Sequence, residues 1–147
     1  MSNAGIATAV AAWFDQNQDK VVGWRRHIHS HPELSNEEVE TTEFLVNVLE
    51  EHGLKPVRFP GTGLYVDLGP TEGKRLAFRA DIDALRVPEQ TGLPFASVNP
   101  GVSHSCGHDV HTTVALGLAC ALSTIELEQG VRVIFQPAEE VMGCLLY

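Results

Sequence analysis

The chain has 147 residues, of which 44% are hydrophobic, and this size and composition predict one domain with a single core. Nineteen Asp and Glu residues outnumber ten Lys and Arg residues, and the formal charge of -9 excludes the basic surface that nucleic acids and anionic membranes require. No apolar run reaches the roughly 18 to 20 residues of a membrane span and no secretory signal is recognisable, so we expect a cytoplasmic protein with small-molecule or metal partners.

The first part of the chain predicts two helices. Apolar residues recur at helical spacing from about Ile6 to His29, and Pro32 ends this helix because proline disfavours helical angles in the residue before it. Ser35 and Glu38 form a capping-box pattern for a second helix, which Gly53 ends. The buried stripe of this helix is expected to consist of Val39, Leu45, Val48 and Leu49.

Short β-branched or aromatic runs predict strands in the middle of the chain. GLYVDLG at 63–69 and RLAFRA at 75–80 are separated by the turn-forming GPTEGK at 69–74, so we expect two neighbouring strands. Residues 88–101 contain three prolines and two glycines, and they predict a loop with one short strand at LPFAS, 93–97.

The last part of the chain predicts a crossover between parallel strands. TTVALGLACALSTI at 112–125 predicts an apolar helix whose small residues allow close packing, and VRVIF at 131–135 predicts a buried strand. A strand, an apolar helix and a strand in this order are typical of a right-handed βαβ unit. We therefore expect an α/β fold, a parallel-rich sheet flanked by helices, in one domain over residues 1–147, of which 1–4 (MSNA) look like an expression-tag remnant.

Side chains with metal-ligand chemistry fall where these predicted elements end. They are Asp81 and Asp83 after the strand at 75–80, Cys106 and His108 before the apolar helix, and Glu139 and Glu140 after the last strand. In an open α/β sheet, the carboxyl ends of the strands and the helix N-termini share one edge, where ligands bind. Converging carboxylates repel one another unless a cation lies between them, so we expect these groups to meet around a divalent metal ion.

These residues also have ordinary structural interpretations. Three widely spaced cysteines argue against a disulfide framework, and a lone cysteine usually packs as a small hydrophobe, as we expect of Cys120 and Cys144. Cys106 differs, because His108 lies two residues away and a nearby helix N-terminus favours the thiolate. The remaining alternatives are turn capping by Asp81 and Asp83, a solvated surface pair at Glu139 and Glu140, a core or capping role for His111, and solvent or carbonyl contacts for HIHSH at 27–31.

Four motifs resemble a known enzyme family. RADIDAL at 79–85, with Glu89 close behind, HSCGHDVHT at 104–112 and FQPAEE at 135–140 resemble signatures of the dinuclear metal amidohydrolases related to aminoacylase and carboxypeptidase. The branch is that of the hippurate hydrolases and auxin-conjugate hydrolases, and RRHIHSHPELS at 25–35 is similar to its N-terminal motif. The resemblance implies the N-terminal part of a phosphorylase/hydrolase-like metallopeptidase catalytic domain, which cleaves N-acyl amino acids.

The resemblance also implies a role for each matching residue. The metal ligands are Cys106, His108 and Glu140, the general base is Glu139, and the residues beside the ligands are Asp83, Asp81 and His111. Two divalent ions per complete site are implied. A thiolate ligand favours zinc, carboxylate ligands also suit manganese, and cobalt or nickel are alternatives.

This chemistry suits the residue types. Amide hydrolysis needs a strong nucleophile and a polarised carbonyl, and a bound divalent ion supplies both. Glu139 would take the proton of the attacking water and return it to the departing amine, while Glu140 would face the metal because adjacent extended residues point opposite ways. The rival enzyme is a thiol hydrolase with Cys106 as nucleophile, but it leaves the Asp and Glu groups unexplained.

The chain is shorter than the family resemblance implies, since it ends in VMGCLLY at 141–147, soon after the glutamate pair. We expect a truncated chain without the family's inserted lid or dimerisation domain, and an inactive fragment or binding domain is the second alternative. Alone, it should bind divalent metal weakly and show no amidase turnover. Missing strands beside residues 131–135 should leave an apolar edge that favours a homo-dimer or aggregate.

Overall fold

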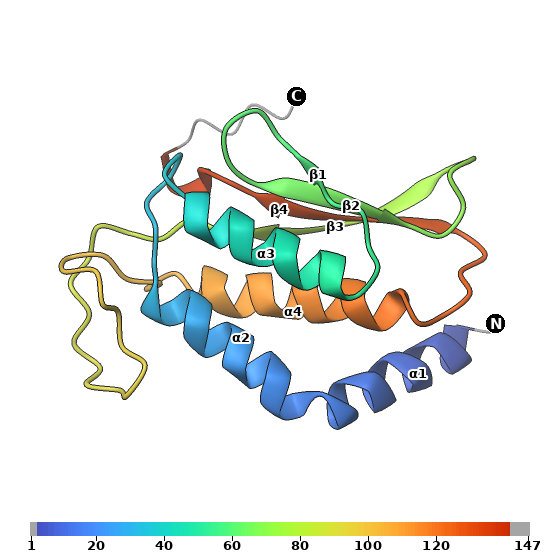
Figure 1. Ribbon diagram of the computed structural model, residues 1–147, viewed down its shortest axis with the longest axis horizontal. Coiled ribbons are helices and arrows are strands. Elements are labelled where there is room, and N and C mark those ends of the chain that lie inside the picture. The colour runs from blue at the N-terminus through green and yellow to red at the C-terminus, as the bar shows by residue number, and fades with distance from the viewer. Residues whose placement is uncertain (1–2, 142–147) are drawn as a thin grey trace.

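The computed structural model describes residues 3–141, which form helices on one side of a four-stranded sheet (Figure 1). In chain order the elements are α1 (Asn3–Gln16), α2 (Gln18–Ser30), α3 (Val39–Glu51), β1 (Val57–Arg58), β2 (Leu64–Leu68), β3 (Arg75–Asp81), α4 (His108–Leu122), β4 (Gly130–Gln136) and the short 3-10 helix η1 (Glu139–Val141). The predicted α/β class is confirmed. Within the described residues, no helix is long and apolar enough to cross a membrane.

The sheet is mixed and has the order β1-β2-β4-β3. β3 and β4 are parallel and α4 connects them, which confirms the predicted βαβ unit. β2 pairs antiparallel with both β1 and β4, so this part of the sheet is not parallel-rich. The prediction that β2 and β3 are neighbours is also wrong, because β4 lies between them. β4 supplies the fully buried Val133 and Phe135, and a central position lets them pack between strands on both sides.

Small residues let α4 pack closely against its neighbours. Ala115 and Ala119 are fully buried in the core. Gly117 faces α1, where an added Cβ would lie 2.6 Å from the ring of Phe14. Cys120 is fully buried, which confirms its predicted packing role, whereas Cys144 lies outside the described residues.

The single helix predicted over Ile6–His29 is instead two helices, α1 and α2, which meet at Asn17 at an angle (Figure 1). The Asn17 side-chain amide donates a hydrogen bond to the Trp13 carbonyl at 2.8 Å, and such local bonds compete with a continuous helix. Trp13 and Trp24 would lie about 16 Å apart along one straight helix. The bend brings their ring centroids to 6.4 Å, so the break improves the aromatic packing.

The start of α3 does not form the predicted capping box. Ser35 and Glu38 turn toward other segments, and neither side chain caps the helix. Glu33 takes this role, because its carboxylate accepts the backbone N–H groups of Glu40 at 3.0 Å and Thr41 at 2.7 Å. A negative charge at this end also suits the helix dipole.

Two further local predictions differ from the structure. Val39 is 57% exposed, because it is the first residue of α3, while the rest of its predicted stripe is buried. No strand forms at 93–97. The backbone N–H of Ser97 donates to the Glu89 carboxylate and that of Val98 to the Ser30 carbonyl, so these groups are not available to a sheet.

Candidate metal centre

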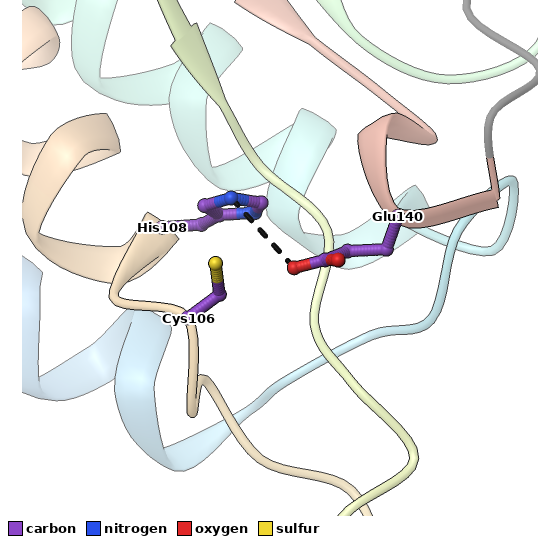
Figure 2. A group of neighbouring side chains, drawn as sticks. All are labelled: Cys106, His108 and Glu140. Carbon is purple, nitrogen blue, oxygen red and sulfur yellow. Dashed lines mark ion pairs between the residues drawn. The ribbon is translucent and has the colours of Figure 1, made fainter.

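Three side chains from two separate segments meet at one edge of the sheet (Figure 2). Cys106 precedes α4, His108 is the first residue of α4, and Glu140 lies on η1; one ligand atom from each lies within 4.8 Å of the others. Tetrahedral zinc with bonds of about 2.0 to 2.3 Å would hold its ligands about 3.3 to 3.8 Å apart. Side-chain shifts of about 1 Å would therefore let the three atoms bind one ion.

The parallel pair of strands brings these segments together. Asp81 at the end of β3 is in register with Gln136 at the end of β4, so the two chain segments leave the sheet at the same edge. The N-terminus of α4 begins at that edge. The prediction that Cys106, His108 and the two glutamates lie together is confirmed.

His108 is oriented as metal-binding histidines usually are. Its Nδ1 donates to the backbone carbonyl of Asp83 at 2.9 Å, which leaves Nε2 for an ion. Nε2 lies 3.8 Å from Glu140 Oε1, too far for a hydrogen bond. Among the described residues, this buried Oε1 has no hydrogen-bond partner. A buried carboxylate oxygen that faces an imidazole nitrogen at 3.8 Å, without a hydrogen bond, fits a divalent cation between them.

Asp83 holds both His108 and Glu140 in place. It is fully buried, and its Oδ2 accepts the Ser35 hydroxyl at 2.7 Å and the Glu140 backbone N–H at 2.9 Å. Burial by itself would raise the pKa of Asp83, but hydrogen bonds from His108, the Glu140 N–H and Ser35 outweigh it and lower that pKa to about 2. Hydrogen bonding to Asp83 in turn raises the pKa of His108 to about 9, so metal binding at neutral pH must release a proton.

The Cys106 thiol does not match the prediction that the helix N-terminus favours its thiolate. The neighbouring Glu140 carboxylate, the slight desolvation of this exposed side chain and the charges of Glu139 and Asp83 raise the pKa of the Cys106 thiol. Three nearby carboxylates therefore disfavour the thiolate of Cys106. A divalent ion would reverse this balance, because a coordinating thiol is deprotonated.

The glutamate pair is not extended, contrary to the sequence-based expectation. Glu139 and Glu140 lie on η1, where successive side chains diverge by about 120° instead of pointing to opposite sides. Both reach toward His108 Nε2, at 4.0 Å from a Glu139 oxygen and 3.8 Å from a Glu140 oxygen. Glu139 has the more exposed side chain of the two, at 40% against 20%, and can contact water.

The other predicted neighbours of the ligands lie further out. The Asp81 carboxylate accepts Arg79 Nε at 2.8 Å, and the exposed His111 ring lies 6.2 Å from the His108 ring. A role for Asp81 and His111 in metal binding stays a prediction. His104 is 5% exposed, neither of its ring nitrogens has a hydrogen-bond partner among the described residues, and burial lowers its pKa to about 4.

A buried charge network beside the centre was not identified from the sequence. His29 Nδ1 lies 2.7 Å from Asp109 Oδ2, and His29 Nε2 lies 3.1 Å from Glu89 Oε1. Arg25 also forms an ion pair with Asp109 at 2.8 Å. All four residues of this network lie in or beside the sequence motifs described above, which could have indicated it. The alternating histidines of HIHSH instead favoured solvent-exposed rings.

The chain is similar to metallopeptidases in both sequence and fold. The model of peptidase family M20/M25/M40 matches residues 77–145. The crystal structure of YxeP from Bacillus subtilis, a dinuclear metal-binding peptidase from family M20, superposes with a TM-score of 0.82 at 44% identity, over 86% of this chain and 37% of that one.

Two curated proteins give similar matches. N-acetyl-L-cysteine deacetylase of Bacillus subtilis is 47% identical over 84% of this chain and 30% of its own length. A putative glutamate–cysteine ligase of Rhodococcus jostii is 51% identical over 90% of this chain, but over only 17% of its own length. The chain thus spans less than a third of either curated relative that it matches.

Proposed function

We propose that the chain belongs to peptidase family M20/M25/M40 and carries the metal-binding part of an amidohydrolase that cleaves N-acyl amino acids with metal-activated water. The observation that carries the proposal is the convergence of Cys106, His108 and Glu140, whose ligand atoms lie within 4.8 Å of one another. The buried oxygen of Glu140, which has no hydrogen-bond partner among the described residues, supports it.

The proposed mechanism assigns one task to each side chain. Cys106, His108 and Glu140 would hold one divalent ion, and a second ion would need ligands beyond this cluster. When bound, the metal would lower the pKa of a coordinated water to about 7 and polarise the carbonyl group of the substrate. Glu139 would accept the proton of the attacking water and transfer it to the leaving amine. Asp83 would keep His108 Nε2 directed at the ion through the contacts described above.

The substrate class comes from the relatives. We propose that the substrate is an N-acetyl or N-benzoyl amino acid. N-acetyl-L-cysteine is the first candidate, because a relative that is 47% identical over most of this chain is named N-acetyl-L-cysteine deacetylase. Hippurate is the second candidate, from the motif resemblance. Zinc is the preferred metal because Cys106 supplies sulfur, and manganese, cobalt and nickel are alternatives.

Two other functions are less well supported. A thiol hydrolase would need a Cys106 thiol with a lowered pKa, whereas its surroundings raise it. The second alternative is that the 147-residue chain, by itself, is an inactive fragment or a binding domain. Three ligands leave the rest of the coordination sphere to solvent, and losing even one aligned donor for the developing oxyanion costs about 100- to 1000-fold in rate.

The test compares metal binding by the chain with hydrolysis by the complete gene product. Zinc titration calorimetry should show binding that Cys106→Ser and Glu140→Gln each weaken. In the complete gene product, chelation should abolish hydrolysis of N-acetyl-L-cysteine or hippurate. Glu139→Ala should lower kcat by about 100- to 10,000-fold without weakening zinc binding, whereas Glu51→Ala on the exposed side of α3 should change neither. Full activity after exhaustive chelation would refute the proposal.

A further inference from the structure

Glu38 is a fully buried carboxyl group whose contacts lie outside its own helix. Its Oε2 accepts the Thr62 hydroxyl at 2.6 Å, and its Oε1 accepts the backbone N–H of Ala138 at 2.8 Å. A carboxyl group is costly to remove from water unless such bonds replace its hydration. Neither bond caps α3. The buried position of Glu38 is instead explained by its bond to the backbone of Ala138, in the loop after β4.

Ala138 has an unusual backbone conformation at the start of this loop. Its φ is 57°, in the left-handed region that residues with a Cβ seldom adopt. This turn redirects the chain from the end of β4 into η1, which carries Glu139 and Glu140. The Glu38 oxygen bonds the N–H of the strained residue itself, and an observed strained residue beside a functional group is a reason to look for a positioning role.

Other contacts fix the same loop from both sides. Gly63 packs so closely that an added Cβ would lie 2.6 Å from Pro137 Cδ, and its N–H donates to the Thr42 hydroxyl of α3 at 2.9 Å. On the far side, the Glu140 N–H donates to Asp83 at 2.9 Å. The turn is therefore held before and after Glu139.

We propose that Glu38 is a positioning residue, which holds the left-handed turn at Ala138 so that Glu139 and Glu140 face His108. The inference rests on the proposed function for the roles of the two glutamates. The turn itself can be tested without a metal or a substrate.

The first experiment measures amide hydrogen exchange by NMR in the metal-free chain. In the wild type, the Ala138 N–H should exchange about as slowly as core amides of β2, although it lies in a loop. Glu38→Met, which fills the space but offers no acceptor, should speed exchange at Ala138 by about 10-fold or more and leave Val66 in β2 unchanged. Glu38→Gln keeps an acceptor oxygen and should behave like the wild type.

The second experiment measures zinc affinity by calorimetry. Glu38→Met should weaken zinc binding by about 10-fold, in the range found when groups that orient metal ligands are removed. Adding Ala138→Gly should restore much of this affinity, because glycine adopts a positive φ without strain. Thr62→Ser keeps the hydroxyl that donates to Glu38 and should leave zinc affinity near the wild-type value.

The outcomes separate this inference from the proposed function. Rapid exchange of Ala138 in the wild type, or unchanged exchange in Glu38→Met, would overturn the role of Glu38 whether or not zinc binds. If Glu38→Met does not fold, the wild-type exchange rate still decides the question. Slow wild-type exchange without any zinc binding would instead support the turn and refute the metal centre.

Discussion

His29 illustrates how one side chain can connect three segments. Of the three histidines in HIHSH, it alone is buried, while the rings of His27 and His31 stack on each other with centroids 4.6 Å apart. Both ring nitrogens of His29 face carboxylates, one on the first turn of α4 and one in the loop after β3. The two nitrogens lie 2.7 Å from Asp109 and 3.1 Å from Glu89, both within hydrogen-bond distance. It therefore fixes α2 and the loop against the helix that begins with His108.

We predict that His29→Ala lowers the free energy of unfolding by about 3 kcal/mol, because it leaves Asp109 buried with only Arg25 as an ionic partner within the network. Urea denaturation at neutral pH would measure the change. His31→Ala in the same segment is the control and should cost less than about 1 kcal/mol. Equal losses in both variants would contradict the structural role assigned to His29.

A second residue-scale prediction concerns acid stability. The Thr91 hydroxyl, the Ser97 backbone N–H and His29 lower the pKa of Glu89 to about 2, from an ordinary value of 4.5. Because the folded-state pKa lies below the unfolded value, Glu89 stabilises the fold above about pH 4.5, and this contribution is lost as the pH falls toward about 2. Denaturation midpoints should therefore show Glu89→Gln less stable than wild type at pH 6, with the difference disappearing near pH 2. A difference that is constant with pH would refute the assignment.

At the scale of elements, the βαβ unit and the start of β2 together form the frame of the metal centre. β3 and β4 end in register, and Gly63 before β2 lies against the segment that leaves β4. Gly63 needs to be glycine for two reasons. Its φ is +78°, and an added Cβ would also lie 2.7 Å from the Phe135 carbonyl oxygen.

Gly63→Ala should therefore cost about 3 kcal/mol of stability, as the sum of backbone strain and overpacking. Gly73 provides a matched control, because its φ is +83° but an added Cβ would meet nothing within 4 Å. Gly73→Ala should cost only the backbone strain, about 1 kcal/mol. Thermal and urea denaturation of the two variants would test this difference, and a loss at Gly73 as large as that at Gly63 would show that packing against Pro137 is unimportant.

At the scale of the whole molecule, the exposed sheet edge differs from the one expected from the sequence. Residues 131–135 were expected to form an uncovered edge, but they belong to β4, which pairs on both sides. In the described residues the edge strands are β1 and β3, and on β3 Leu76 is 60% and Phe78 is 38% exposed. These side chains line a groove of about 950 Å³ that α1 and the end of α4 border. An apolar groove beside a strand edge favours association.

We predict that the 147-residue chain self-associates through the β3 edge, and that Phe78→Lys and Leu76→Lys each shift it toward the monomer. Sedimentation velocity at concentrations up to about 100 µM would measure the distribution of species. Val98→Lys removes a similarly exposed apolar residue from a loop and should have no effect. A wild-type chain that stays monomeric over this range would refute the prediction.

Local patterns in the sequence were sufficient to predict much of this architecture and the residues of the centre. Hydrophobic periodicity predicted α3, α4 and the three longer strands, because each period reflects contacts that one face of an element makes. The meeting of Cys106, His108 and Glu140 also followed from the sequence, since parallel strands joined by a helix must end at the same edge.

Tertiary structure alone decided the strand order and the partners of the buried polar side chains. Glu38 bonds a residue 100 positions away and His29 one 80 positions away, and both had ordinary local interpretations in the sequence. A capping box depends on residues that are close together in the sequence, so it can be recognised there. The partner of a buried carboxyl group depends on which distant segments packing brings together, and no local period encodes that choice.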